Sequence, residues 1–189
     1  MPRPQRYNTD VLLEAAAEIL ASDGPAAVTM SAVARAARAP SGSMYHRFPT
    51  RAALCARLWL RSQERFHAGL MAALADATDR QDRCVAGARF VVGWCRDEPV
   101  QAQVLLVGAD ALARDEWPPD ALRRYDELRR ELDQTLRGLR RRADHDRITA
   151  AVIDIPYAIV RRHLRSGAPL PAAAEDIVED CARALVPRD

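Results

Sequence analysis

The residues with the clearest chemical potential lie in a basic segment near the N-terminus. Between Gly24 and Gln63 the sequence has no Asp or Glu, although an even spread of the 26 acids would place about five there. An acid-free basic surface suits contact with a polyanion, because carboxylates repel phosphate. A chance gap in the acids would give the same pattern, so charge alone leaves both interpretations open. The segment contains six arginines: Arg35, Arg38, Arg47, Arg51, Arg57 and Arg61.

Two short helices are expected inside this segment. Apolar spacing predicts the first over Thr29–Ala37, with Thr29 as its N-cap. Pro40 limits its end, because the residue before a proline avoids the helical region. Ser41 begins the second helix, which reaches about Phe48. The short gap between them is typical of a helix-turn-helix, whose second helix enters the major groove of DNA by its N-terminal residues.

The second of these helices begins with the small residues Ser41-Gly42-Ser43. Small side chains allow a close approach to DNA, and hydroxyls can donate to bases or phosphates. Tyr45 and His46 follow one turn later and can reach phosphate oxygens, whereas Met44 and Phe48 suit the core. The segment therefore predicts a DNA-binding surface.

The rest of the chain has helical periodicity and no convincing strand pattern, which predicts an all-α fold of about nine helices. A stripe on the first helix comprises Val11, Leu12, Ala15, Ala16, Ile19 and Leu20, with Asn8 or Thr9 as the cap and Gly24 at the end. Val100–Leu112 is apolar enough to predict burial nearly all round, and Pro156 predicts a kink. The other helices are expected from Thr50 into 72–77, over Asp79–Asp97, from Trp117 to about Arg142, from Asp144 or Asp146 to Arg165, and over Ala172–Leu185.

Several protein classes are disfavoured by the sequence. The four cysteines form no CxxC, and Cys and His do not cluster at ligand spacing, so we expect neither a metal site nor a cofactor. Motifs of phosphate loops, HExxH and GxSxG are missing, which disfavours an enzyme. The N-terminus has no apolar signal segment, and the longest apolar run is shorter than the ~20 residues of a membrane span. We therefore expect a cytoplasmic protein with no membrane partner.

Two stretches resemble the TetR family of bacterial transcriptional regulators: Val28–Ala34 and Ser41–Leu54. The second carries a Tyr-x-x-Phe-x-x-basic-x-x-Leu pattern after a small-residue turn, and the detailed resemblance covers about residues 8–58. It implies an N-terminal three-helix DNA-binding domain (1–50) and an all-helical ligand-binding and dimerisation domain (51–189). It also implies a homodimer on a palindromic double-stranded operator, usually a repressor that an unknown small-molecule effector releases.

The resemblance also assigns roles at matching positions. Tyr45 would contact phosphate, and His46 phosphate or a base. Arg51 takes the place of the usual Lys as a phosphate contact, where arginine keeps the charge and adds a bidentate option. The remaining assignments are Thr29 on phosphate and Ser31, Ser41, Gly42 and Ser43 facing bases.

Arg38 departs from the family pattern, which commonly has Gly in the turn. A positive φ would cost Arg roughly 1 kcal/mol relative to Gly, so the turn either bears this strain or closes differently with the help of Pro40. The departure, together with the short side chains of Ser41 and Ser43, suggests an alternative function. In that alternative the chain is a helical small-molecule binding or interaction protein with a degenerate helix-turn-helix.

The C-terminal part of the sequence gives weaker indications of a ligand pocket and of a dimer interface. The larger side chains available to a ligand pocket are Trp94, Trp117, Tyr125 and Tyr157, although such residues more often belong to a core. The last two helices carry apolar stripes that pack either inside the monomer or across a two-fold interface, and the resemblance favours the interface. These stripes comprise Ile148, Val152, Ile155, Ile159, Ile177, Val178, Cys181 and Leu185.

Overall fold

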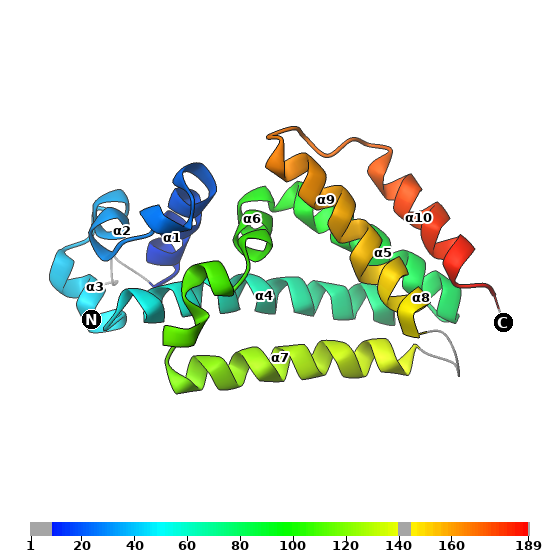
Figure 1. The fold of residues 1–189 in the computed structure, drawn as a ribbon, viewed down its shortest axis with the longest axis horizontal. Helices are drawn as coiled ribbons and strands as arrows, with labels where there is room; N and C mark the ends of the chain where they lie inside the picture. The colour runs from blue at the N-terminus through cyan, green and yellow to red at the C-terminus, as the bar shows by residue number, and fades with distance from the viewer. Residues whose placement is uncertain (1–8, 140–144, 189) are drawn as a thin grey trace, which may run out of the picture. The chain divides into compact units, whose positions relative to one another are not determined.

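The computed structural model describes residues 9–139 and 145–188, and its regular structure there is entirely helical (Figure 1). The all-α prediction is confirmed. The α-helices are α1 (Thr9–Asp23), α2 (Met30–Ala36), α3 (Ser41–Arg47), α4 (Arg51–Ala75), α5 (Arg80–Asp97), α6 (Pro99–Val107), α7 (Pro119–Gly138), α8 (His145–Thr149), α9 (Ile155–Arg165) and α10 (Ala174–Leu185). A π-helical turn, Ala150–Asp154, joins α8 to α9. Counted with this turn as one helix, they make nine in the described ranges, as expected. The candidate cap Asn8 and the expected boundary positions Arg142 and Asp144 lie outside those ranges.

Packing divides the chain into two compact units. The first comprises Met1–Gln63 and Val100–Asp126, and the second comprises Glu64–Pro99 and Glu127–Asp189. The expected boundary between domains after residue 50 is a boundary between functions. The packing units do not test it, so it stays a prediction.

Local side-chain bonds fix the helix starts that the sequence predicted. The Oγ1 of Thr29 accepts a hydrogen bond from the amide of Ala32 at 3.1 Å, so Thr29 caps α2. Thr50 caps α4 through the amide of Ala53 at 3.0 Å. Such caps satisfy amides that have no partner in the first helical turn. At the end of α1, Gly24 takes a φ of 81° and donates its amide to the Leu20 carbonyl, which stops the helix there.

The core of the first unit includes one face of α1. Leu12, Leu13, Ala16, Ala17 and Leu20 are buried. This face lies one residue along from the expected stripe, and Val11 is 44% exposed.

A polar chain also crosses this core. The hydroxyl of Ser62 donates to Oε1 of Gln101 at 2.7 Å, and Nε2 of Gln101 donates to Glu14 at 3.1 Å. This chain of bonds joins α4, α6 and α1. The expectation that Val100–Leu112 is buried nearly all round is wrong. In α6 only Gln101, Ala102 and Val104 are buried. The helix ends before Gly108, where φ is 82°.

In the second unit α5 packs against α10, the π turn and α9 (Figure 1). Pro156 is buried and is the second residue of α9, which follows the π turn. A proline cannot donate to the helical ladder, so the wider turn before it lets the helix continue. Burial raises the pKa of Cys84 to about 11 and that of Cys95 to about 12, which keeps these free thiols protonated.

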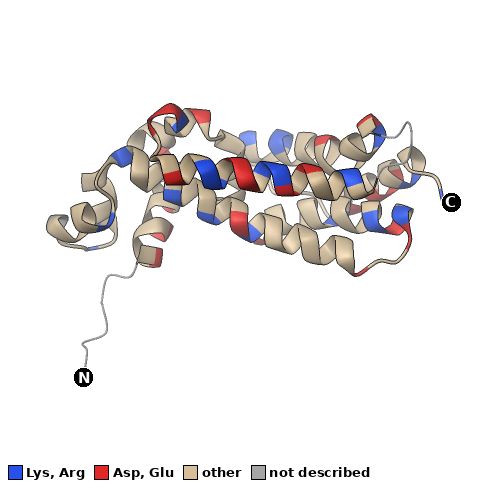
Figure 2. Cartoon of the chain, turned by 90° about the horizontal axis from the view of Figure 1, so that it is seen from below, with Lys and Arg blue, Asp and Glu red and all other residues tan. Residues whose placement is uncertain are grey.

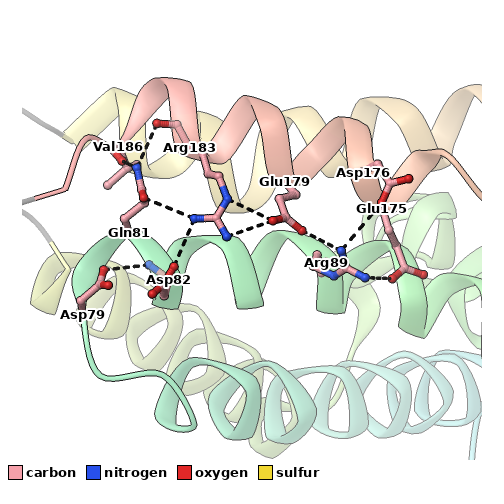
Figure 3. Close-up of polar contacts among 9 residues, drawn as sticks. All are labelled: Asp79, Gln81, Asp82, Arg89, Glu175, Asp176, Glu179, Arg183 and Val186. Carbon is pink, nitrogen blue, oxygen red and sulfur yellow. Dashed lines mark hydrogen bonds and ion pairs between the residues drawn. The ribbon is translucent and has the colours of Figure 1, made fainter.

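A ladder of ion pairs joins α5 to α10 (Figure 3). Arg89 donates to Glu179 at 2.7 Å and to Glu175 at 3.0 Å. Arg183 donates to Glu179 on its own helix and to Asp82 on α5. These bonds lower the pKa of the Glu179 carboxyl, chiefly through the hydrogen bond from Arg89 and then the one from Arg183. The ladder holds the exposed edges of α5 and α10 together above their apolar contact.

Basic and acidic residues are interspersed along α7. In Figure 2 the ribbon of α7, which crosses the front of the view, alternates between blue and red where its basic and acidic residues lie. Among the described helices none is long and apolar enough to cross a membrane. The described residues also hold no group of three or more Cys, His, Asp or Glu able to bind a metal ion.

Candidate nucleic-acid interface

The helix α3 is anchored on one side and open on the other. Met44 and Phe48 are buried, as expected, and fix α3 against its neighbours. Tyr45 is 60% exposed, and His46 and Gly42 are exposed as well. Ser43 is half-buried, and its hydroxyl accepts a hydrogen bond from Arg47 at 2.7 Å. The open face of α3 therefore offers a small residue, a phenol and an imidazole to a partner.

The helix α2 and the turn after it complete the two-helix motif. The capping hydroxyl of Thr29 lies 3.3 Å from the hydroxyl of Ser31, and Ser31 is exposed. A hydroxyl that accepts a backbone bond still has its own proton to donate, so Thr29 can cap α2 and bond a phosphate at once. The positions of Thr29 and Ser31 are therefore compatible with the roles that the resemblance implies.

The turn between α2 and α3 takes the geometry usual for glycine. Arg38 has a φ of 52°, in the left-handed region. The amide of Ala39 donates to the Ala34 carbonyl at 2.8 Å, which closes the end of α2 around this residue. Of the two expected outcomes, a turn that closes differently is wrong, and Arg38 bears the strain of roughly 1 kcal/mol. The helix-turn-helix geometry is thus intact without the glycine.

Arg51 has a structural role that sequence reasoning missed. Its Nε donates to the Val28 carbonyl at 2.8 Å and its Nη2 to the Pro25 carbonyl at 2.7 Å. Both carbonyls lie just before α2, so the guanidinium ties the start of α4 to the start of the helix-turn-helix. No local spacing signals a contact across 23 residues. The phosphate contact implied for Arg51 stays a prediction, for which Nη1 remains available.

The four candidate ligand-binding residues are divided between the two units. In the first unit Trp117 and Tyr125 lie together, with ring centroids 6.1 Å apart, and Trp59 packs against both. The indole of Trp117 donates to the Leu112 carbonyl at 3.0 Å. In the second unit Trp94 packs edge-on against Phe66, and Tyr157 is 41% exposed on α9.

Trp59 is a further candidate ligand-binding residue, which the sequence analysis did not identify. Its indole nitrogen is buried and has no hydrogen-bond partner among the described residues. An open groove of about 510 Å³ also lies in the first unit, with Phe48, Leu60 and Ala121 among its lining residues. None of the four sequence candidates lines this groove.

The N-terminal geometry has a counterpart in a known family. Residues 12–58 match the model of the tetR family of bacterial regulatory proteins. This segment of the chain is therefore similar to the N-terminal part of TetR-family regulators. The matched residues run from α1 into α4 and so include α2, the turn with Arg38 and all of α3. The resemblance seen in the sequence is confirmed.

Solved structures extend the likeness in fold to nearly the whole chain. A TetR-like transcriptional regulator from Rhodococcus sp. RHA1 is 19% identical, with 98% of each chain covered and a TM-score of 0.71. The regulator FadR from Bacillus subtilis, in complex with stearoyl-CoA, is 12% identical over 95% of this chain and 98% of its own, with a TM-score of 0.74.

A third neighbour is the multidrug binding protein EbrR complexed with imidazole. It is 21% identical over 98% of this chain and 97% of its own, with a TM-score of 0.61. No sequence among the curated proteins matches the chain. At these identities the solved structures establish the fold alone.

Proposed function

We propose that the chain is a ligand-responsive, sequence-specific DNA-binding transcriptional regulator of the cytoplasm, and not an enzyme. It acts as a repressor that a small molecule releases from its operator. The observation that carries this proposal is the open face of α3, where Gly42, Tyr45 and His46 are exposed on a helix anchored by Met44 and Phe48. This face belongs to a segment without a single acidic residue.

In the proposed complex α3 lies in the major groove. Gly42 lets the backbone approach the base edges, and Tyr45 reaches a phosphate at the side of the groove. His46 contacts phosphate or a base. The other proposed contacts are Ser31, Ser41 and Ser43 with bases, and Thr29 and Arg51 with phosphates.

The proposed operator is palindromic because the regulator is proposed to be a homodimer. On α9 and α10 the side chains of Tyr157 and Ile177 are 41% and 44% exposed, so these helices retain apolar surface for a two-fold partner. A dimer of this kind sets two half-sites one turn of DNA apart, ~34–36 Å.

The proposed effector is a small molecule bound by the expected ligand-binding domain, residues 51–189. The support is that FadR of Bacillus subtilis was solved with stearoyl-CoA and EbrR with imidazole. The aromatic residues Trp94, Trp117, Tyr125 and Tyr157 remain the proposed contacts. The intact turn at Arg38 supports a working DNA reader over the alternative of a degenerate helix-turn-helix in an interaction protein.

The test is fluorescence anisotropy of labelled DNA from upstream of the chain's own gene, with a scrambled duplex as competitor and a salt titration. The expected result is preferential binding that weakens steeply as salt rises, because the protein displaces counterions from phosphates. The double variant Tyr45→Ala with Arg51→Ala is expected to abolish it. Equal, weak binding to both duplexes, or full binding by the double variant, would contradict the proposal.

A further inference from the structure

The six arginines of the acid-free segment differ in what they bind inside the molecule. Arg47 donates to Ser43, Arg51 donates to two backbone carbonyls, and Arg61 lies 3.1 Å from a carboxylate oxygen of Glu14. Arg57 also has an interaction within the chain. Arg35 and Arg38 are exposed and make no hydrogen bond or ion pair with any residue that the structure describes. These two guanidinium groups are therefore accessible to solvent or to a binding partner.

Arg38 is the more informative of the two because its backbone is strained. It has a φ of 52°, a conformation that glycine adopts without cost. An arginine there makes the fold less stable than a glycine would. A residue held in such a conformation points to a function of its side chain.

The dipole of α2 is an alternative, purely structural reason for an arginine at position 38. A cation near the C-terminus of a helix interacts favourably with the helix dipole, and Arg38 follows α2 by two residues. Arg35, in the last turn of α2, already provides such a cation. The dipole therefore gives little reason to tolerate the strain at Arg38.

We propose that Arg38, in the turn that leads into α3, binds a backbone phosphate of the DNA and adds affinity that does not depend on base sequence. This inference rests on the proposed function and extends it by one contact per subunit. The turn meets the backbone beside the groove that α3 enters, where a guanidinium can donate two hydrogen bonds to one phosphate. The glycine usual at this position offers no such donor.

The test measures binding to a short duplex of random sequence, so that no operator has to be known. The variants are Arg38→Gly, which removes charge and strain together, and Arg38→Lys, which keeps both. For Arg38→Gly we expect the slope of log K against log salt to fall by about 0.9 per bound subunit. The affinity should fall about fivefold per bound subunit at 0.15 M salt. Arg38→Lys should retain most of the slope.

Thermal unfolding supplies the second readout. Arg38→Gly should melt at a temperature equal to or above that of the wild type, because the strain is gone. Ala113→Gly is the matched control, because Ala113 also has a positive φ, 56°, in the 3-10 turns before α7. It should melt higher in the same way and bind DNA like the wild type.

Each outcome separates this inference from the proposed function. Wild-type slope and affinity in Arg38→Gly would overturn the phosphate contact and leave the regulator proposal standing. Loss of the slope in Arg38→Lys as well would also overturn it, because the charge would then be irrelevant. A lower melting temperature in Arg38→Gly would favour a structural role instead. A folded wild type that binds neither this random duplex nor the DNA from upstream of its own gene would overturn both proposals.

Discussion

The guanidinium of Arg51 donates from Nε to the carbonyl oxygen of Val28 at 2.8 Å, across 23 residues of sequence. Its Nη2 makes a second bond, to the Pro25 carbonyl. A half-buried carbonyl at a helix entry needs a donor, and the forked guanidinium serves both carbonyls from one side chain. These two bonds fix the position of the start of α4 relative to the entry to α2. The orientation of α3 depends on that position.

The variant Arg51→Lys separates this structural role from a purely electrostatic one. Lysine keeps the charge but has a single ammonium in place of the planar fork. We expect a loss of about 1–3 kcal/mol of unfolding free energy, typical of a broken hydrogen bond to a charged group. Urea unfolding and DNA anisotropy measure the two effects. A Lys variant as stable as the wild type would show that the two backbone bonds contribute little.

Tyr45 offers a test of the open face of α3 that does not disturb the core. Its side chain is 60% exposed, so Tyr45→Phe should leave the melting temperature unchanged. If the hydroxyl bonds a phosphate, operator affinity should fall about fivefold per subunit, the effect of roughly 1 kcal/mol. The loss should be similar on operator and scrambled DNA. Binding by Tyr45→Phe that equals the wild type would remove Tyr45 from the contacts.

Gly42 has open space around it and Gly87 is closely packed, and variants of the two test whether α3 lies close to the bases. A Cβ at Gly42 meets no atom within 4 Å, and alanine is the better helix former, so Gly42→Ala should not destabilise the fold. We expect it to weaken preferential operator binding, because the methyl group enters the space between helix and bases.

Gly87→Ala is the contrasting variant. The added Cβ would lie 2.9 Å from Cδ2 of Leu74 and 3.0 Å from Cγ1 of Val152. Because this overpacks the core, the variant should have a lower melting temperature. Well below that temperature it should bind DNA like the wild type. Unchanged operator preference in Gly42→Ala would place that residue away from the bases.

The sequence was most informative where local chemistry decides structure. Caps such as Thr29 and breakers such as Pro40 act within a few residues, so the limits of α2 and α3 could be predicted closely. The positive φ at Arg38 was foreseen as one of two outcomes, because the family pattern has glycine there. Whether arginine would tolerate it depended on the packing around the turn.

Long-range polar contacts were not predictable in this way. Gln101 looks like an interruption in an apolar run, yet it is buried because Ser62 and Glu14 satisfy its amide. The bonds of Arg51 to Pro25 and Val28 have the same character. Such contacts depend on which helices meet in space, and periodicity along one helix does not contain that information.

We expect the ion-pair ladder between α5 and α10 to make the stability of the second unit depend on pH (Figure 3). Hydrogen bonds from Arg89 and Arg183 lower the pKa of Glu179 below its ordinary value of 4.5. A carboxyl with a lowered pKa stabilises the fold above its unfolded-state pKa, and this contribution is lost as pH falls through the folded-state pKa. At neutral pH Glu179→Gln should therefore melt a few degrees below the wild type, and the gap should close below about pH 4.5.

Calorimetry from pH 7 to pH 3, at low and high salt, measures this gap. High salt should shrink it at neutral pH, because the ladder lies at the surface. Asp180→Asn is the matched control, since Asp180 is an exposed carboxylate of α10 that makes no ion pair with the described residues. That variant should melt like the wild type at every pH. A gap for Glu179→Gln that persists undiminished at pH 3 would mean that side-chain packing, and not the charge of Glu179, stabilises α10 on α5.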